Sequence, residues 1–207
     1  MIRMECIPVG FLDVNCYLVW AEGEESALVI DPGAEPAKVD AALAAHALRP
    51  AAILLTHGHV DHIGAVGALA GKHGIPVWLH PAELPLYRSP ANALPPWVPA
   101  ARDLPEPAAA VPIVPGLAFS VLETPGHTRG GVCYYFADSA ALFTGDTLFA
   151  GSVGRTDLHC GDADALQRSI REKLLVLPAA TRVFPGHGGS TTVGTEAAEN
   201  PYLIKAP

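Results

Sequence analysis

Residues 56–62 read THGHVDH, directly after a short apolar run that is typical of a buried strand. Side chains two apart at the end of a strand point the same way, so His57 and His59 can bind one cation. The glycine between them permits close approach of the backbone. The chain then turns into a predicted helix, which carries Asp61 and His62 to a neighbouring position. A pair of surface histidines is the competing interpretation, and this density of ligands disfavours it.

Three further potential ligands also follow apolar, strand-like runs: His127, Asp146 and His187. Each is preceded by a glycine, which lets the chain turn sharply and leaves room near a metal. A loop at the end of a rigid strand is where functional residues usually lie. Any one of the three is a weak signal. Together with residues 56–62 they supply five histidines and two aspartates.

Seven such ligands suit two metal ions better than one. One ion held by three histidines leaves a coordination position for water, and a second would have two histidines and one aspartate. The remaining carboxylate can bridge both ions. Nitrogen and carboxylate ligands without cysteine favour Zn, Fe, Mn or Co over copper or an iron–sulfur cluster. Two ions about 3.5–4 Å apart can share a hydroxide whose pKa is lowered towards neutrality.

The order and spacing of these residues resemble the metallo-β-lactamase superfamily. Three longer runs are similar to its glyoxalase II branch, the hydroxyacylglutathione hydrolases: GDTLF at 145–149, GRTD at 154–157 and FPGHG at 184–188. The resemblance spans nearly the whole chain. It implies an α/β fold of the four-layer αββα sandwich type, with the metal ions at one edge.

The resemblance also implies a role for each ligand. The first ion would be bound by His57, His59 and His127, the second by Asp61, His62 and His187, and both by the bridging Asp146. The expected cofactors are two divalent transition-metal ions, Zn or Fe, with Mn as a further option. Asp61 is the predicted catalytic residue, because it lies beside the nucleophile and orients the water.

The leading functional hypothesis is hydrolysis of a small thioester such as S-2-hydroxyacylglutathione, by attack of a metal-bridging hydroxide. A thiolate with a pKa near about 8.5 leaves without a strong general acid. An amide or lactam nitrogen needs a proton donor, and the sequence identifies none. The true zinc β-lactamases of the superfamily that the chain resembles have Arg or another residue in place of His62 and often cysteine in place of Asp146, so these two positions point away from β-lactams.

Two other classes of function compete with this hypothesis. A mononuclear iron persulfide dioxygenase of the same superfamily would use two histidines and one aspartate, a set available here as His57, His127 and Asp146, and this is the composition of a non-haem iron facial triad. The short loop at 148–152 resembles the hydrolases more and favours hydrolysis. A metal-stabilised scaffold protein is the weakest alternative, because an open, hydrated metal pair has no structural necessity.

Arg155 is the candidate substrate-binding residue. It lies nine residues after Asp146, where longer glyoxalase II enzymes resemble it in having a basic residue for the glycine carboxylate of glutathione. An ion pair with Asp157 is the alternative interpretation. Only twenty residues follow His187, so the chain resembles the short form, which lacks a carboxy-terminal helical domain.

Composition excludes several classes of protein. The chain has 207 residues, is 50% hydrophobic and 16% charged, and carries a formal net charge of -8. Disorder is excluded because it needs low hydrophobicity, and no apolar stretch approaches the roughly 20 residues of a membrane span. The acidic balance argues against nucleic acid as a partner. Without a recognisable signal peptide, we expect a cytoplasmic protein with a small-molecule substrate and four reduced cysteines.

Strands and helices are mixed along the whole chain and no flexible linker divides it, so we expect one α/β domain over residues 1–207. Strands are predicted at 3–8, 15–21, 27–30, 51–55, 77–79, 118–123, 132–136, 140–143 and 182–184. Helices are predicted at 36–48, 63–73, 164–175 with Asp162 as its cap, and 195–203. Residues 76–115 contain eleven prolines, which predicts an ordered loop system beside a site rather than long helices or central strands. A polyproline recognition segment is the alternative, disfavoured by the irregular spacing.

Overall fold

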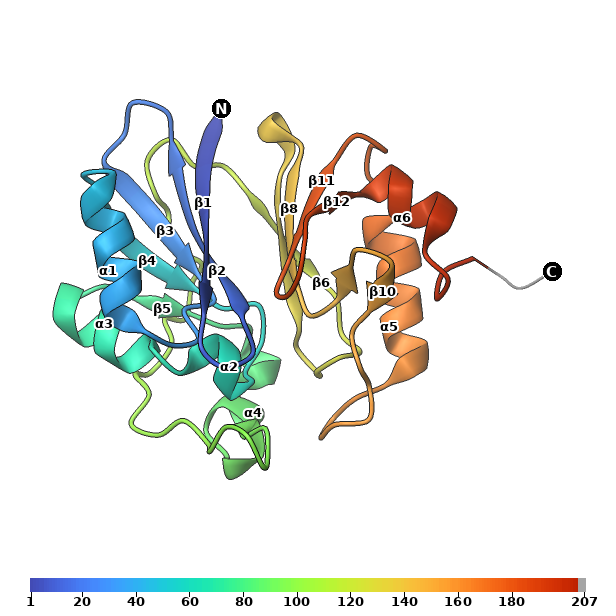
Figure 1. The fold of residues 1–207 in the computed structure, drawn as a ribbon, viewed down its shortest axis with the longest axis horizontal. Coiled ribbons are helices and arrows are strands. Elements are labelled where there is room, and N and C mark those ends of the chain that lie inside the picture. The colour runs from blue at the N-terminus through green and yellow to red at the C-terminus, as the bar shows by residue number, and fades with distance from the viewer. Residues whose placement is uncertain (205–207) are drawn as a thin grey trace. The chain divides into compact units, whose positions relative to one another are not determined.

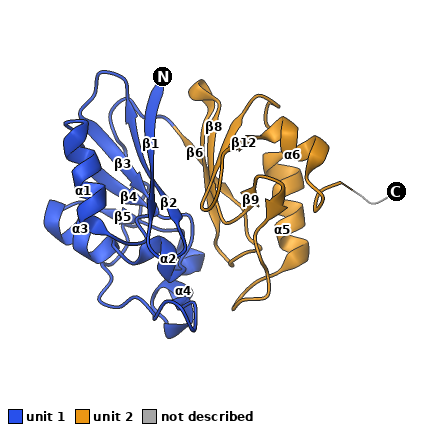
Figure 2. Ribbon diagram, viewed as in Figure 1, with its two compact units in different colours: residues 1–118 blue, residues 119–207 orange. Residues whose placement is uncertain are grey.

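The computed structural model describes residues 1–204, which form two compact units divided after residue 118 (Figure 2). The strands predicted from the sequence are all present, and their ends differ from the prediction by no more than two residues. Three short strands were not expected: β9 Leu148–Phe149, β10 Ser152–Val153 and β12 Thr191–Thr192. Each has only two residues and is too short to carry a periodic pattern.

The first unit contains a five-stranded sheet in the order β1-β2-β3-β4-β5 (Figure 1). The strands are β1 Ile2–Val9, β2 Val14–Ala21, β3 Ser26–Ile30, β4 Arg49–Leu54 and β5 Val77–Trp78. The first three pair antiparallel, whereas β3, β4 and β5 pair parallel. Parallel neighbours need a crossover connection, and the helices between them provide it.

Helices α1 Pro36–Ala45 and α3 Val66–His73 make these crossovers. Pro36 begins α1 because its missing N–H costs nothing at that position. The helix ends before the predicted residue 48, because Ala47 adopts a left-handed conformation with φ 54. Residues 63–73 are not one helix: α2 Val60–Ile63 is a separate turn before α3. Buried side chains of both crossover helices share one core with the sheet, including Val39, Leu43, Leu69, Leu18, Val29 and Ile53.

The proline-rich segment has the predicted character. Over residues 76–115, all of which the structure describes, the helices are one-turn elements: η1 Pro81–Glu83, α4 Leu84–Tyr87 and η2 Pro90–Asn92. Asn92 is fully buried and organises the loops, since its Nδ2 donates to the carbonyl of Tyr87 and its Oδ1 accepts from the amide of Ala101. The segment is therefore ordered by its own hydrogen bonds.

The second unit contains a five-stranded sheet in the order β12-β11-β8-β7-β6. The strands are β6 Ser120–Glu123, β7 Val132–Phe136, β8 Ala141–Gly145, β11 Arg182–Pro185 and β12 Thr191–Thr192. Strands β8 and β11 are parallel, and the other pairs are antiparallel. A separate hairpin is formed by β9 Leu148–Phe149 and β10 Ser152–Val153.

Helix α5 Ala163–Ser169 begins at the predicted cap, because the carboxylate of Asp162 accepts from the amide of Ala165 at 2.9 Å. The remainder of the predicted helix is a π-helical turn, η4 Ile170–Leu174, which the four-residue spacing did not reveal. Helix α6 Val193–Glu199 starts earlier and ends earlier than predicted, with Thr192 as its cap and a turn from Pro201 onwards. Buried Leu166, Ile170, Leu174, Val183 and Val193 form this unit's core.

Within residues 1–204, no helix has the length and apolar character needed to cross a bilayer. The cytoplasmic location inferred from the sequence stays a prediction. The assignment of residues 1–207 to a single domain also stays a prediction.

Candidate metal centre

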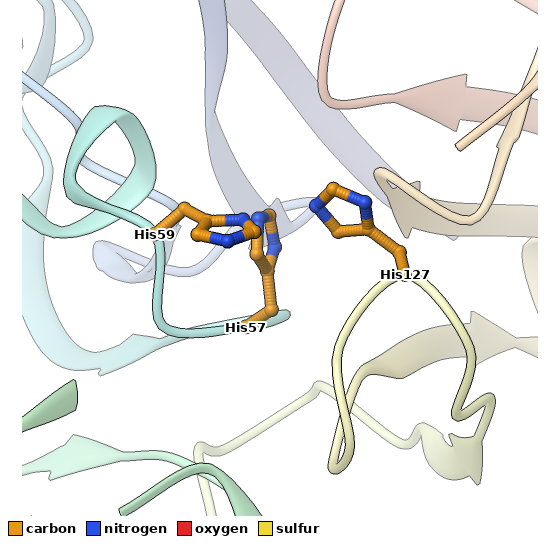
Figure 3. A group of neighbouring side chains, drawn as sticks. All are labelled: His57, His59 and His127. Atoms are coloured by element: carbon orange, nitrogen blue, oxygen red, sulfur yellow. The ribbon is translucent and has the colours of Figure 1, made fainter. Parts of the chain in front are cut away.

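Four predicted ligands lie together at the carboxyl end of β4, in the first unit. We call His57, His59, Asp61 and His62 the amino-terminal ligand cluster. The rings of His57 and His59 are 4.9 Å apart at their centroids, and those of His57 and His62 are 4.1 Å apart. Figure 3 shows His57 and His59 on their shared loop. All three histidines are buried. The structure brings these residues together, and their role as metal ligands stays a prediction.

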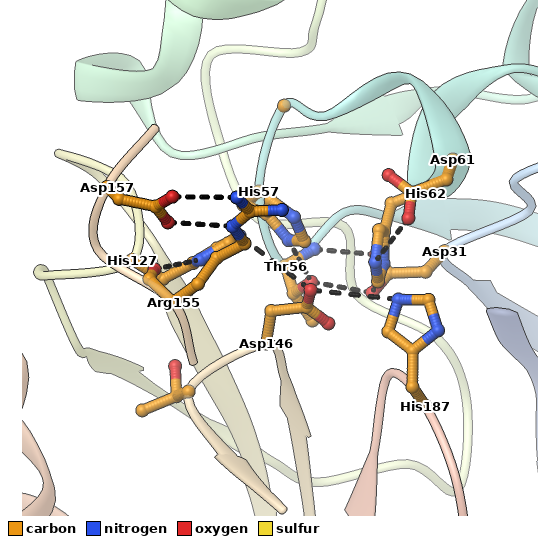
Figure 4. Close-up of polar contacts among 12 residues, drawn as sticks. Asp31, Thr56, His57, Asp61, His62, His127, Asp146, Arg155, Asp157 and His187 are labelled. Atoms are coloured by element: carbon orange, nitrogen blue, oxygen red, sulfur yellow. Dashed lines mark hydrogen bonds and ion pairs between the residues drawn. The ribbon is translucent and has the colours of Figure 1, made fainter. Parts of the chain in front are cut away.

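Asp31, which the sequence analysis did not single out, holds this cluster in place. It follows β3 and is buried. Its Oδ1 accepts from the amide of Thr56 at 2.7 Å, and its Oδ2 accepts from Thr56 Oγ1 at 2.6 Å. The same Oδ2 lies 3.0 Å from Nδ1 of His62 (Figure 4). This contact turns the other nitrogen, Nε2, towards Asp61 and fixes the orientation of the ring.

Glu83 holds the same loop at its centre. The carboxylate comes from the proline-rich segment, is 1% exposed and accepts from the amide of Gly58 at 2.9 Å. A β-carbon at position 58 would lie 3.2 Å from this carboxylate.

The loop after β3 packs closely against α2. A β-carbon at Gly33 would lie 1.4 Å from the carbonyl oxygen of Asp61, so only glycine allows this close approach.

Three predicted ligands lie together in the second unit, and we call His127, Asp146 and His187 the carboxy-terminal ligand cluster. They follow β6, β8 and β11 respectively. Oδ2 of Asp146 lies 3.7 Å from Nε2 of His127 and also 3.7 Å from Nε2 of His187. These distances are too long for hydrogen bonds. Two ligands of one cation, each at about 2.0–2.2 Å from it, stand roughly 3.3–3.6 Å apart in tetrahedral geometry, so the separations are close to those of metal ligands.

A backbone carbonyl holds His127, the residue of this cluster that follows β6. Nδ1 of His127 bonds to the carbonyl oxygen of Arg155 at 2.7 Å (Figure 4), so the other ring nitrogen, Nε2, is directed towards Asp146. Gly126 has φ 144, and a β-carbon there would lie 2.3 Å from the backbone of Leu166. The glycine therefore lets the loop pack directly against α5.

Asp146 is held in a similar way. A β-carbon at Gly154 would lie 1.9 Å from the carbonyl oxygen of Asp146. The hairpin β9–β10 can therefore return against the ligand loop only because residue 154 is glycine. The aromatic ring of Phe149 in this hairpin lies 6.3 Å from the ring of His187.

Arg155 forms the ion pair that was the alternative interpretation of this residue. Its Nε and one terminal nitrogen each donate to the carboxylate of Asp157 at 2.7 Å. These hydrogen bonds raise the pKa of Arg155 and lower the pKa of Asp157 to about 2. Both side chains are exposed, at 55% and 67%. The role of Arg155 in substrate binding stays a prediction.

The two carboxylates that hold the first cluster, Asp31 and Glu83, were not identified from the sequence. Asp31 carried one signal, since an aspartate directly after a buried strand lies at the same sheet edge as the ligand loop when the two strands are parallel. Glu83 stands among prolines in the sequence and carried no such signal. Its burial depends on how the loop system folds.

Comparison with known proteins places this chain in a family. Residues 9–187 match the Metallo-beta-lactamase superfamily. The chain is 36% identical to hydroxyacylglutathione hydrolase GloC of Haemophilus influenzae, over 97% of this chain and 98% of that protein. The crystal structure of BLEG-1 B3 metallo-beta-lactamase has a TM-score of 0.87 and 39% identity, covering 97% of this chain and 99% of that one. TTHA1623 in a di-iron-bound form has a TM-score of 0.83 and 42% identity, covering 96% and 100%.

These similarities extend over nearly the full length of the chain and over both ligand clusters. The predicted fold class is confirmed, as a mixed α/β fold with two sheets and helices. The chain belongs to the metallo-β-lactamase superfamily of metallo-hydrolases.

Proposed function

We propose that the two ligand clusters together bind two divalent transition-metal ions and that the chain hydrolyses a small thioester such as S-2-hydroxyacylglutathione. One ion is held by His57, His59 and His127, the other by Asp61, His62 and His187, and Asp146 is shared. The observation that carries the proposal is the position of Asp146 Oδ2, at the same 3.7 Å from Nε2 of His127 and of His187. A carboxylate in this position can serve two ions whose other ligands are different histidines.

The donor set fits these ions. Imidazole and carboxylate ligands without thiolate suit Zn, Fe or Mn. In the first unit, Oδ2 of Asp61 lies 3.8 Å from Nε2 of His62, again close to the separation of two ligands on one cation. The similarity to a di-iron-bound protein supports iron as one of the candidates.

When bound, two such ions supply an acidified water and polarise the carbonyl that it attacks. The residues of the chain set the geometry. Asp31 fixes the ring of His62, and the carbonyl of Arg155 fixes the ring of His127. Asp61, beside His62, orients the attacking water through its carboxylate. The thiol of the leaving group has a pKa of about 8.5, so it departs as a thiolate and needs no strong general acid.

A glutathione conjugate is the favoured substrate class because a full-length relative carries the name hydroxyacylglutathione hydrolase. Arg155 is the proposed partner of a substrate carboxylate. Its guanidinium faces Asp157 in a bidentate pair, so binding would exchange one carboxylate for another at the same donors. Both side chains are exposed, which keeps the cost of this exchange small.

Hydrolysis of β-lactams is a second candidate function. It is favoured by the similarity to BLEG-1 B3 metallo-beta-lactamase over nearly the full length of both chains. The sequence had pointed away from this substrate because of His62 and Asp146. The similarity makes a direct test necessary.

Three assays on the full chain, with its metal content measured, distinguish the candidates. We expect rapid release of thiol from S-lactoylglutathione and slow opening of a chromogenic β-lactam. Faster turnover of the β-lactam would replace the thioester with the second candidate. Uptake of oxygen with glutathione persulfide, together with a single iron per chain, would identify the persulfide dioxygenase instead.

A further inference from the structure

Helix α6 carries a buried carboxylate whose hydrogen bonds lead to the carboxy-terminal ligand cluster. Glu196 is 2% exposed. Its Oε2 accepts from the amide of Gly151 at 2.9 Å and from Nδ2 of Asn200 at 2.7 Å. Its Oε1 accepts from Oγ1 of Thr191 at 2.7 Å. The three donors are a backbone amide, a side-chain amide and a hydroxyl, all of them neutral.

Two of these hydrogen bonds join the segments that follow two metal ligands. Gly151 is the turn of the β9–β10 hairpin, which starts two residues after Asp146 and returns to pack against its carbonyl at Gly154. Thr191 lies in β12, four residues after His187. Glu196 therefore connects the segment after Asp146 with the segment after His187.

Asn200 strengthens the same connection. It is fully buried, and its Nδ2 donates to the carbonyl of Ser152 at 3.0 Å as well as to Glu196. The hairpin turn is thus held at two successive residues, 151 and 152. The ring of Phe149, in the same hairpin, lies 6.3 Å from the ring of His187.

A carboxylate is a costly way to anchor a helix. Burying a charged group is unfavourable unless hydrogen bonds offset the loss of water. Val193 already anchors α6 in the apolar core of this unit, and an apolar residue at position 196 would add to that core without the cost. What a carboxylate provides is two acceptor atoms that fix two separate segments at once.

We propose that Glu196 is a positioning residue, which sets the distance between the segments carrying Asp146 and His187 and so tunes the affinity of the metal ion that His187 binds. The inference rests on the proposed function, since it takes both residues as metal ligands.

The experiment is a zinc titration of the full-length chain against a chromogenic chelator. Wild type, His187→Ala, Glu196→Ala, Glu196→Gln and Thr191→Val are compared. Glu199→Ala is the matched control, because Glu199 lies on the same helix and is exposed. The melting temperature of each metal-free variant is measured in parallel, so that a loss of metal binding is separated from a loss of fold.

His187→Ala should remove one zinc-binding step. Glu196→Ala should lower the zinc affinity of that same step by about tenfold or more. Thr191→Val should weaken the same step, with a metal-free melting temperature close to that of wild type. Glu196→Gln should retain most of the affinity, because the amide nitrogen can donate to the hydroxyl of Thr191 while the amide oxygen accepts from Gly151. Glu199→Ala should match wild type.

Two outcomes would contradict different claims. If His187→Ala removes no binding step, the proposed ligand set is wrong. If His187→Ala removes a step that Glu196→Ala and Thr191→Val leave unchanged, the ligand set stands and the positioning role of Glu196 is overturned. A lower metal-free melting temperature in Glu196→Ala with no change in zinc affinity would also overturn it.

Discussion

The two ligand clusters of this chain are held in different ways. In the amino-terminal ligand cluster, four ligands lie within residues 57–62, and two buried carboxylates, Asp31 and Glu83, accept hydrogen bonds from the loop itself. In the carboxy-terminal ligand cluster, each ligand comes from a different strand end. There the backbone carbonyl of Arg155 bonds to one ligand, and glycines let the ligand loops pack against neighbouring backbone. Glu196 contacts no ligand and bonds instead to the hairpin that follows Asp146.

This difference has a physical reason. A continuous loop can be fixed by one or two groups that bond to its own amides and rings. Three loops from separate strands need the sheet to align them and further contacts to set their spacing. We therefore expect substitutions around the first cluster to act on individual ligands, and substitutions around the second to act on the spacing between ligands.

The largest effect should come from Asp146→Ala. The carboxylate lies between His127 and His187, so its loss should lower the metal content from two ions per chain to fewer than one and reduce kcat/KM about 10³-fold. Elemental analysis and thiol release measure this. Asp138→Ala is the matched control, since Asp138 is an exposed acid of the same unit. Two ions retained in Asp146→Ala would show that the second cluster does not depend on a shared carboxylate.

Asp61→Ala tests the ligand predicted to be catalytic in the first cluster. We expect kcat to fall roughly 10²–10³-fold, because the attacking water loses the carboxylate that orients it. The metal content must be measured in the same sample. Turnover near that of wild type with two ions present would exclude the proposed role of Asp61.

Asp31→Asn tests whether the first cluster is held by a direct contact. The NH2 group of the new amide would lie either against the backbone amide of Thr56, which is itself a donor, or against the hydroxyl of Thr56 and the ring of His62. We expect the free energy of unfolding without metal to fall by about 1–3 kcal/mol and the affinity of one zinc ion to fall about 10–100-fold. Asp40→Asn serves as the comparison, because Asp40 also bonds to a histidine and lies near the surface. An equal loss of zinc affinity in both variants would contradict a specific role for Asp31.

The smallest effect should come from the exposed pair in the second unit. Arg155→Ala should raise KM for the glutathione thioester about tenfold and change kcat less, since a carboxylate contact of this kind is similar in the ground and transition states. Asp157→Asn should leave KM unchanged or lower it, because it frees the guanidinium. If both substitutions leave KM unchanged, Arg155 belongs to a structural pair alone.

The pH dependence of this pair has a definite sign. The pKa of Asp157 is lowered from 3.8 to about 2 by the hydrogen bonds from Arg155. The contribution of the pair to stability is therefore complete above about pH 4 and is lost as the pH falls through about 2. Between pH 5 and 9, the difference in KM between wild type and Arg155→Ala should not change.

Much of the fold, and the places where the candidate ligands gather, could be predicted from the sequence. The apolar runs located the strands, and the strand ends located His57, His127, Asp146 and His187. The predicted cap at Asp162 is present. These features depend on residues close together in the chain, where spacing and local chemistry are informative.

The supporting residues could not be predicted in the same way. Asp31 bonds to Thr56 across 25 residues, and Glu196 bonds to Gly151 across 45. A carboxylate in a sequence does not reveal whether tertiary structure buries it. The π-helical turn at Ile170–Leu174 was missed for a similar reason, because its apolar spacing is also that of an α-helix.

The central claim is that two ligand clusters from different parts of the chain bind a pair of metal ions. The most direct test is the metal content of the purified full-length chain by elemental analysis, after loading with excess zinc or iron and removal of free metal. We predict two ions per chain, falling to one in His62→Ala. If the chain holds a single ion, and added zinc or manganese does not raise the metal content above one, the claim is contradicted.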